Sequence, residues 1–383
     1  MKDTEDLLAL RQTLVRFLDN EVPRALAAQW DRDNHFPRET FLKLAELGVL
    51  GLTIPQDFGG LGRDIVATMA VIEELASRSL ALAIPYINAA CYAGMNIVEC
   101  GTEAQKAQIL PRVVEGRMIF AYGWTEPDSG SDLASMRTRA QRVGDTVVVN
   151  GAKRFCTGAG ESDYIYTLVR TGPEQERYRN LTLLLIPPNH PGVHIEGING
   201  LGLKGFPTTD VRFDNVELPL TAIVGGEQAW NQAWPMVVGP GLDVEKLEVA
   251  AMALGVARAA LEDAWSYAGE RRQFGKTIGS YQSIQHKLAD MKTRLHAARL
   301  VLYHAAQLAN DGRPCTGETS MAKLFATEAC KYIALECQTI FGAYGYVKEF
   351  AVERYVRDAL GLPIIGGSSA IQRNNIYKWM KRQ

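Results

Sequence analysis

The sequence predicts an α+β fold in which a helical segment, a block of β-strands and a segment of long helices follow one another. Two changes of hydrophobic period support this prediction. Apolar residues recur every three or four positions up to about Arg117, short β-branched and aromatic runs then replace them, and helical spacing returns near Leu242. Strands and helices do not alternate, and no Gly-x-Gly-x-x-Gly follows a strand, so a Rossmann fold is not expected.

The first 120 residues are expected to be helical. Helical spacing of apolar residues runs through LLALRQTLVRFL, through FPRETFLKLAELGVLGL with a stop at Gly48, and through IVATMAVIEELASRS. The first twenty residues are acidic and amphipathic, which indicates a packed helix rather than a signal peptide. The apolar run SLALAI ends at Pro85 and is too short to span a bilayer, so no membrane insertion is expected.

The middle block is expected to form strands. Its short segments are rich in β-branched and aromatic residues and are separated by Gly, Pro, Asn or Asp: RMIFAYGWTE, TVVVNGAKRF, YIYTLVR, LTLLLIP, VHIEGI and TDVRFDNVEL. The sequences VGD and NG are expected to form hairpin turns.

Long helices are expected at Leu242–Glu270, Tyr281–Asn310 and Thr316–Ile340. The predicted domains are therefore an N-terminal helical domain (1–119), a middle β domain (120–230) and a C-terminal helical bundle (231–383).

Composition excludes several classes of function. A net charge of −2 gives no reason to expect nucleic acid or an anionic membrane as partner. The six cysteines form no Cys-x-x-Cys pair and no metal-ligand spacing with histidine, so we expect buried thiols in a reducing cytoplasm and no metal site. His286, His296 and His304 fall on helical stretches and are expected to be structural or exposed.

Three segments suit a bound cofactor. AYGWTEPDSGSD (121–132) is a strand that runs into a Gly/Ser/Asp loop, whose N–H groups and hydroxyls suit ring carbonyls and phosphates. NGAKRFCTGAG (150–160) places an aromatic residue and a threonine on a strand edge. ERRQFGKTIGSYQSIQHKLADM (270–291) contains paired arginines, whose guanidinium groups match phosphate oxygens. Taken alone, the first segment could be any polar turn, and the third could be a solvated basic helix end.

Together and in this order, the three segments resemble the acyl-CoA dehydrogenase family of flavoproteins. The resemblance extends from LGLTIPQDFGGLG and GTEAQKAQILPRVVEG to the C-terminal AIQR. It implies an N-terminal helical domain, a middle antiparallel β domain and a C-terminal four-helix bundle. It also implies FAD between the last two domains, with the adenosine diphosphate end reaching a neighbouring subunit of a homotetramer that is a dimer of dimers.

The resemblance also implies roles for individual residues. The β-domain motifs imply that Tyr122, Thr125 and Ser131 line the flavin and the thioester, and that Phe155 and Thr157 flank the flavin ring. Cofactor contacts carried over from the C-terminal motifs fall on Arg271, Phe274, Gln282, Gly342 and Ser368, the first three of them gripping the FAD of the neighbouring subunit. Substrate contacts are implied for Ser131, Asp243, Lys246 and Gly366.

The chain departs from the family pattern at several positions. Phe155 stands where tryptophan is usual, which keeps a stacking surface and loses a polar N–H. In QTIFGAYGY (338–346), Thr339 and Ala343 replace the glutamine and the second glycine that usually frame Gly342. In the C-terminal motif, Gly366 stands where much of the family carries the glutamate that removes the α-proton.

A different carboxylate is expected to replace the missing base. Glu245 lies on the first long helix and resembles the glutamate that isovaleryl-CoA and long-chain members carry there. Glu248, about 60° further around the helix, is an alternative base, and a chain without a conventional base is another. Asp243 is expected to cap or anchor the helix start. Lys246 stands where the family usually has an arginine. Lysine keeps the positive charge but lacks the paired N–H donors of a guanidinium group.

The expected reaction is FAD-dependent α,β-dehydrogenation of an acyl thioester, as acyl-CoA or on a carrier protein, with an electron-transfer flavoprotein as acceptor. Tyr86, Asn88 and Tyr92 in PYINAACYAG suggest a short, branched or polar acyl chain, although simple helix packing explains them equally well. Two alternatives stay open: a flavin monooxygenase or desulfinase of the same fold, for which loss of the base at Gly366 is harmless, and a non-catalytic FAD-containing interaction protein.

Overall fold

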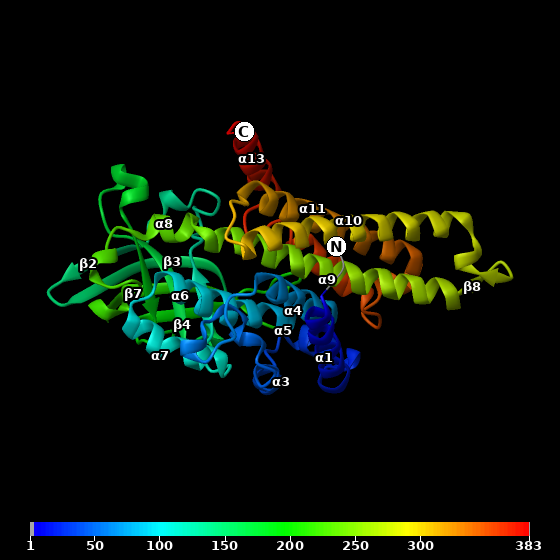
Figure 1. Ribbon diagram of the computed structural model, residues 1–383, viewed down its shortest axis with the longest axis horizontal. Helices are drawn as coiled ribbons and strands as arrows, with labels where there is room; N and C mark the ends of the chain where they lie inside the picture. The colour runs from blue at the N-terminus through cyan, green and yellow to red at the C-terminus, as the bar shows by residue number, and fades with distance from the viewer. Residues whose placement is uncertain (1–3, 383) are drawn as a thin grey trace.

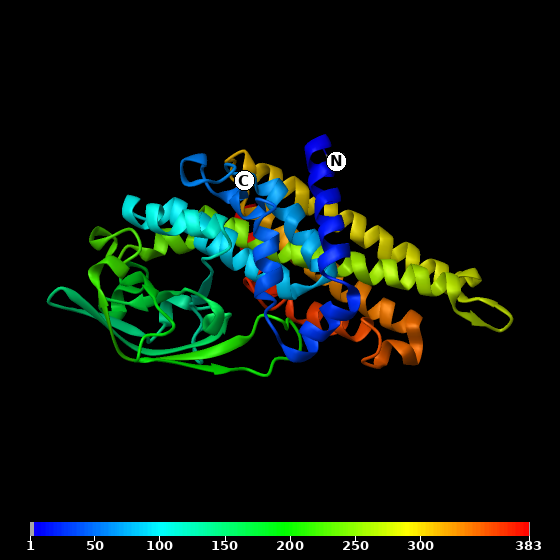
Figure 2. The same ribbon diagram turned by 90° about the horizontal axis from the view of Figure 1, so that it is seen from below.

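The computed structural model describes residues 4–382 and joins the predicted segments into one elongated molecule (Figure 1). The β-sheet lies at one end, the long C-terminal helices extend to the other, and the N-terminal helices pack against both. The turned view shows the same order (Figure 2).

The N-terminal helices follow the predicted pattern. They are α1 (Glu5–Glu21), α2 (Arg24–Asp33), α3 (Arg38–Ala45), α4 (Ile65–Arg78), α5 (Leu80–Tyr86), a π-helix η3 (Ile87–Met95), α6 (Asn96–Cys100) and α7 (Glu103–Val114). Side chains that accept hydrogen bonds from the first turn start several of them, among them Asp64 for α4 and Thr102 with Gln105 for α7.

The expectation that the apolar run ends at Pro85 is wrong. The helical path continues through Pro85 into η3 and α6, although proline cannot donate a backbone hydrogen bond at its own position. Leu80–Cys100 is therefore long and apolar enough to cross a membrane by composition, with a mean hydropathy of 1.3 in its best window. Since 83% of that window is buried inside the protein, its apolar character is that of a core helix.

The middle domain is one sheet. Its strands are β1 (Phe120–Gly123), β2 (Arg139–Val143), β3 (Thr146–Thr157), β4 (Tyr164–Arg170), β5 (Leu181–Ile186), β6 (Val193–Gly197) and β7 (Thr208–Pro219). The order is β1-β4-β2-β3-β7-β6, with β5 also on β4; most pairs are antiparallel, whereas β1 and the end of β2 run parallel to β4.

The turn predictions hold in part. VGD forms the turn between β2 and β3, although β2 itself, which is mostly exposed, was not among the predicted strands. Asn150–Gly151 is not a turn: the pair lies inside β3, where the register shifts against β7 in a bulge. The other NG pair, Asn199–Gly200, lies in the connection between β6 and β7.

The C-terminal helices agree closely with their predicted ranges. They are α8 (Ala233–Val238), α9 (Pro240–Glu270), α10 (Gln282–Asn310), α11 (Thr316–Phe341), α12 (Val352–Gly361) and α13 (Ser369–Met380), and a short hairpin, β8 (Arg272–Gln273) with β9 (Lys276–Thr277), joins α9 to α10. The three histidines of α10 are all exposed.

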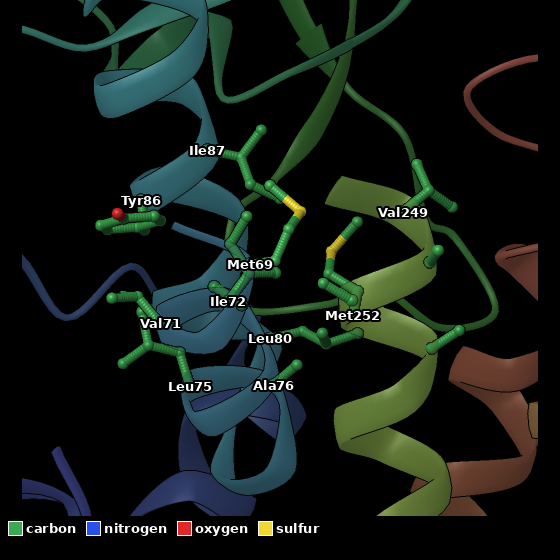
Figure 3. Close-up of a cluster of buried hydrophobic side chains, with 14 of the residues drawn as sticks. Met69, Val71, Ile72, Leu75, Ala76, Leu80, Tyr86, Ile87, Val249 and Met252 are labelled. Atoms are coloured by element: carbon green, nitrogen blue, oxygen red, sulfur yellow. The ribbon is translucent and has the colours of Figure 1, made fainter. Parts of the chain in front are cut away.

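Helix α9 is the shared wall between the N-terminal and C-terminal helices. Gly255 allows α4 to approach closely, because a Cβ there would meet the Glu73 carbonyl oxygen at 2.3 Å. Figure 3 shows the apolar side chains that fill this contact, with Met69 of α4 and Met252 of α9 directed toward one another. Val249, also on α9, lies on the side that faces the C-terminal segment.

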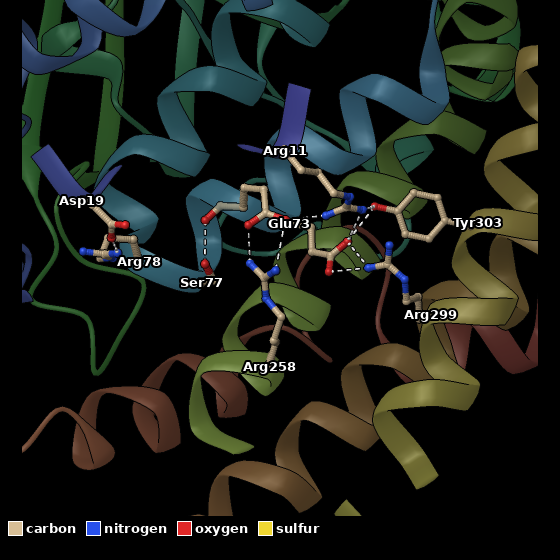
Figure 4. Close-up of polar contacts among 9 residues, drawn as sticks. Arg11, Asp19, Glu73, Ser77, Arg78, Arg258, Arg299 and Tyr303 are labelled. Carbon is tan, nitrogen blue, oxygen red and sulfur yellow. Dashed lines mark hydrogen bonds and ion pairs between the residues drawn. The ribbon is translucent and has the colours of Figure 1, made fainter. Parts of the chain in front are cut away.

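A buried ionic cluster ties four helices together (Figure 4). Arg11 of α1 donates to Glu73 Oε2 (2.9 Å) and Glu74 Oε1 (2.5 Å) of α4. Glu74 also pairs with Arg258 of α9 (2.6 Å), and Glu73 pairs with Arg299 of α10 (2.8 Å). Because these charges are paired in several directions, their burial holds α9 at a defined position against α4.

Candidate active site

A buried ion pair that sequence reasoning missed joins two of the predicted cofactor motifs. Lys153 Nζ of β3 lies 2.8 Å from Glu126 Oε1, and the two side chains are 0% and 6% exposed. Glu126 also accepts from the backbone N–H groups of Arg137 (2.6 Å) and Thr138 (2.9 Å). A charged residue at an inward position of a strand was the available signal, since a buried lysine requires a partner.

This pairing brings Thr125 beside Phe155. The Arg154 N–H donates to the Thr125 carbonyl (2.8 Å), and the bulge between Lys153 and Cys156 gives Phe155 a φ of 60°. The Phe155 ring is 56% exposed, whereas the hydroxyl of Thr157 lies 3.1 Å from that of Thr208. Ser131 is exposed in the loop that follows β1.

These residues fit the flavin ring of FAD. An exposed aromatic face at Phe155 stands near two threonines, and the buried Trp124 Nε1–H has no partner among the described residues. Such a donor next to an aromatic surface suits a planar ring that carries carbonyl oxygens.

Stacked aromatic rings lead from this surface into the helical part of the molecule. The ring of Tyr122 stacks on Trp124 (4.4 Å between centroids) and on Tyr92 of η3 (3.6 Å). Asn96 donates to the Tyr122 hydroxyl. Asn88 donates to the Thr157 carbonyl (3.3 Å), so η3 touches the predicted flavin strand.

Of the three polar residues predicted near the acyl chain, Tyr86 points elsewhere. Its hydroxyl donates to the Val49 carbonyl (3.1 Å), and Figure 3 shows the ring on the side of the helix away from α9. Packing therefore explains Tyr86, whereas Asn88 and Tyr92 face the middle domain.

Glu245 lies one turn into α9, half-buried and close to the stacked tyrosines. Burial raises the pKa of its carboxyl to about 7, although the cations Lys246 and Lys323 oppose that rise. The charge of Glu245 in turn raises the pKa of Tyr92 and of Tyr122, both already raised by burial. A carboxylate with such a pKa can accept and release a proton near neutral pH.

Glu248 lies deeper in the protein than Glu245. Its side chain is buried, and burial together with the neighbouring Glu245 raises its pKa to about 8. Together with burial, the charge of Glu248 raises the pKa of the Cys91 thiol of η3.

A second buried lysine anchors the loop that carries Gly366. Lys323 of α11 donates to the carbonyls of Pro363 (3.1 Å) and Gly367 (2.9 Å), and burial lowers its pKa to about 8. Gln372 donates to the carbonyls of Gly366 (3.1 Å) and Gly367 (3.0 Å). A lone lysine within the apolar SMAKLFATEA could have indicated this anchor.

Gly366 packs directly against α9. Its φ is +57°, and a Cβ at this position would lie 2.8 Å from Val249 Cγ2, one turn beyond Glu245. Ser368, two residues further along the loop, caps α13 by accepting from the Ile371 N–H.

Asp243 does not cap its helix, because α9 already begins at Pro240. Its carboxylate instead accepts from Lys246 (2.8 Å) and from Thr316 and Thr319 of α11 (2.9 and 3.1 Å). The side chain of Lys246 is 3% exposed. The pair therefore ties the start of α9 to α11, which is the anchoring role expected of Asp243.

The remaining predicted cofactor residues gather at the opposite end of the molecule. Arg271, Phe274 and Gln282 lie at the hairpin between α9 and α10, and Arg271 stacks over Tyr344 (5.4 Å), two residues after Gly342. Phe274 is 93% exposed. At 1.5 Å per residue, the hairpin lies about 38 Å from Glu245 along the axis of α9. Figures 1 and 2 both show it far from the sheet.

Family models match three consecutive parts of the chain. They are described as the acyl-CoA dehydrogenase N-terminal domain (residues 4–117), middle domain (121–216) and C-terminal domain (232–381).

The chain also resembles individual proteins along its whole length. It is 37% identical to an acyl-CoA dehydrogenase of Bacillus subtilis over 99% of both chains. Its structure matches that of butyryl-CoA dehydrogenase from Megasphaera elsdenii with a TM-score of 0.94, at 30% identity over 100% of both chains. The prolyl acyl carrier protein oxidase AnaB matches with a TM-score of 0.91, at 29% identity over 99% of this chain and 100% of that one.

Proposed function

Because the chain belongs to the acyl-CoA dehydrogenase family, we propose that Glu245 is the base with which it desaturates a short acyl thioester. Family membership makes the protein an FAD-dependent oxidoreductase acting on acyl thioesters. The position of its base, its acyl group and its carrier are what the proposal adds.

The environment of Glu245 carries the proposal. Val249, one turn beyond Glu245 on α9, lies 2.8 Å from the position that a Cβ at Gly366 would take, so Glu245 stands on the part of the helix that borders the loop where a C-terminal base would be. Gly366 cannot accept a proton. Glu248, the alternative base, neighbours Cys91 on the N-terminal side instead.

In the proposed reaction, Glu245 accepts the α-proton of the thioester. Its half-buried carboxyl is desolvated, which makes it a stronger base than an exposed carboxylate. The stacked Tyr92 and Tyr122 form the wall that excludes water beside it. FAD, when bound, supplies the acceptor for the hydride that leaves the β-carbon.

The two groups of cofactor residues support a site shared between subunits. Thr125, Phe155 and Thr157 would hold the flavin ring, whereas Arg271 and Phe274 lie too far along α9 to reach the same molecule of FAD. We therefore propose a homotetramer built as a dimer of dimers, in which the hairpin of one chain grips the FAD of its neighbour.

The thioester carrier, electron acceptor and compartment are also proposals. The likeness to AnaB supports a carrier-protein thioester beside CoA, and an electron-transfer flavoprotein is the acceptor we propose. Six free cysteines, five of them buried, are in keeping with the reducing cytoplasm.

Anaerobic flavin reduction by a panel of acyl thioesters tests the proposal. Wild type should bleach, Glu245→Gln should not, and Glu262→Gln, which removes an exposed charge from the same helix, should behave as wild type. Bleaching that survives Glu245→Gln but is lost in Glu248→Gln would move the base one turn. No bleaching by any thioester, with rapid oxygen consumption by the chemically reduced flavin, would contradict dehydrogenation and indicate a monooxygenase.

A further inference from the structure

We propose that Glu248 selects acyl chains that carry a hydrogen-bond donor, a hydroxyl or an amine, a few carbons beyond the thioester. This inference rests on the proposed function, because it places the thioester at Glu245. It adds a class of acyl group that the family alone does not specify.

The first observation is an unpaired acceptor. Glu248 is 1% exposed, and its Oε2 atom has no hydrogen-bond partner among the described residues. A buried carboxyl oxygen without a partner is unfavourable, so native proteins rarely keep one without a reason. A ligand group that donates a hydrogen bond would remove this cost.

The second observation is the direction from Glu245 to Glu248. The two residues are three positions apart on α9, which is about 4.5 Å along the helix axis. Further along α9 in the same direction, Gly255 packs against Glu73 of the N-terminal helix α4. A chain whose α-carbon lies at Glu245 and which extends toward the N-terminal helices therefore passes Glu248.

The third observation is what lies next along α9. One turn beyond Glu248, Met252 is buried and directed toward Met69 of α4 (Figure 3). These apolar side chains fill the space between the helices. The donor is therefore expected near the end of a short chain, where Glu248 is the last polar group before the apolar contact.

Charge decides which polar groups are accepted. Burial and the charge of Glu245 both disfavour the ionised form of Glu248 and raise its pKa to about 8, so further negative charge is unfavourable there. A third carboxylate, on the acyl chain, would be repelled. A hydroxyl or ammonium group would be attracted, and a plain alkyl end would leave Oε2 unpaired, which a buried polar site discriminates against.

Four acyl-CoA esters of equal chain length test the inference on the FAD-loaded protein: pentanoyl, 5-hydroxypentanoyl, 5-aminopentanoyl and glutaryl. The measured quantity is kcat/KM for anaerobic flavin reduction. We expect the hydroxyl or the amine ester to exceed pentanoyl-CoA by about 10- to 100-fold, the discrimination of one hydrogen bond to a charged or buried group. Glutaryl-CoA should be the poorest substrate.

Two variants of Glu248 and one control complete the test. Glu248→Leu should abolish the preference and raise kcat/KM for pentanoyl-CoA. Glu248→Gln, which keeps size and hydrogen bonding, should retain a preference for the hydroxyl and lose one for the amine, and so distinguishes the two donors. Glu262→Gln on the same helix should keep the wild-type order.

The outcomes separate this inference from the proposed function. Equal reduction by all four esters, or an equal loss for all four in both Glu248 variants, would refute selection by Glu248 while leaving dehydrogenation intact. If neither these esters nor the same acyl groups on a carrier protein reduce the bound flavin, both are overturned.

Discussion

Replacing Gly366 with alanine probes how closely the C-terminal loop approaches α9. The glycine has a φ of +57°, a conformation that costs an L-residue about 1–2 kcal/mol. The new Cβ would also lie 2.8 Å from Val249 Cγ2, well inside the 3.5–4.0 Å at which carbon atoms normally rest. Overpacking of this kind typically costs about 1–3 kcal/mol. Gly366→Ala should therefore lower the free energy of unfolding by about 2–5 kcal/mol.

Two further variants separate the backbone cost from the contact. Gly312 has a φ of +65° with nothing within 4 Å of a Cβ, so Gly312→Ala should show the backbone cost alone. Adding Val249→Ala to Gly366→Ala should relieve the contact, giving a favourable coupling energy of at least about 0.5 kcal/mol in a double-mutant cycle. Urea unfolding followed by circular dichroism measures the wild type, the three single variants (Val249→Ala included) and the double variant. Equal costs at Gly366 and Gly312, with strict additivity toward Val249, would refute the close approach.

The same geometry predicts that the base cannot simply be moved back. In a Glu245→Gln protein, adding Gly366→Glu should leave flavin reduction below about a hundredth of the wild-type rate, since removal of a positioned proton acceptor costs about 10²–10⁴-fold. Stopped-flow flavin reduction measures this rate. Recovery to a tenth or more would show that the loop accommodates a carboxylate after all.

Three other predictions follow from the site. The raised pKa of Glu245 predicts that kcat/KM falls as pH drops below about 7, because the base must be deprotonated to act; a profile flat from pH 6 to 8 would contradict this. Glu126→Gln leaves the buried Lys153 without its carboxylate partner, so the free energy of unfolding should fall by about 3–5 kcal/mol and most of the bound FAD should be lost. Urea unfolding measures the first effect, and the flavin-to-protein absorbance ratio measures the second. Adding Lys153→Met should recover part of both. Two variants, Arg271→Met and Phe155→Asp, should each bind little FAD when expressed alone. Co-expression should restore some FAD sites, because a mixed tetramer can combine an intact Phe155 from one chain with an intact Arg271 from its neighbour. A lack of such complementation would argue against a shared site.

Elements governed by local pattern were predictable from the sequence. The long helices α9, α10 and α11 differ from their predicted ranges by at most two residues at either end, because helical periodicity and end signals are local. The domain boundaries remain a prediction. The prediction fails at Pro85 because proline is a strong local breaker, whereas the chain here stays helical through α5 into the π-helix that follows.

The parts of the site that could not be predicted are those that depend on long-range pairing. Glu126 and Lys153 are separated by 27 positions, and each alone is an ordinary charged residue. Lys323 meets the loop of Gly366 only after α11 and the C-terminal segment have packed together. Such contacts have no periodicity, so only the tertiary structure reveals which charges are buried and paired.

The glycine at 366 and the glutamate at 245 are best understood as one feature rather than two substitutions. The loop approaches α9 so closely at Val249 that any side chain at 366 must displace the Val249 side chain, the helix or the loop. Lys323 and Gln372 hold the loop in that position through four hydrogen bonds to its carbonyl oxygens. A proton acceptor needed near this contact therefore has to come from the helix, and Glu245 supplies one a single turn before Val249. On this view, returning a carboxylate to the loop would require changes at Val249 and in the loop backbone together, which is why no single substitution is expected to restore it.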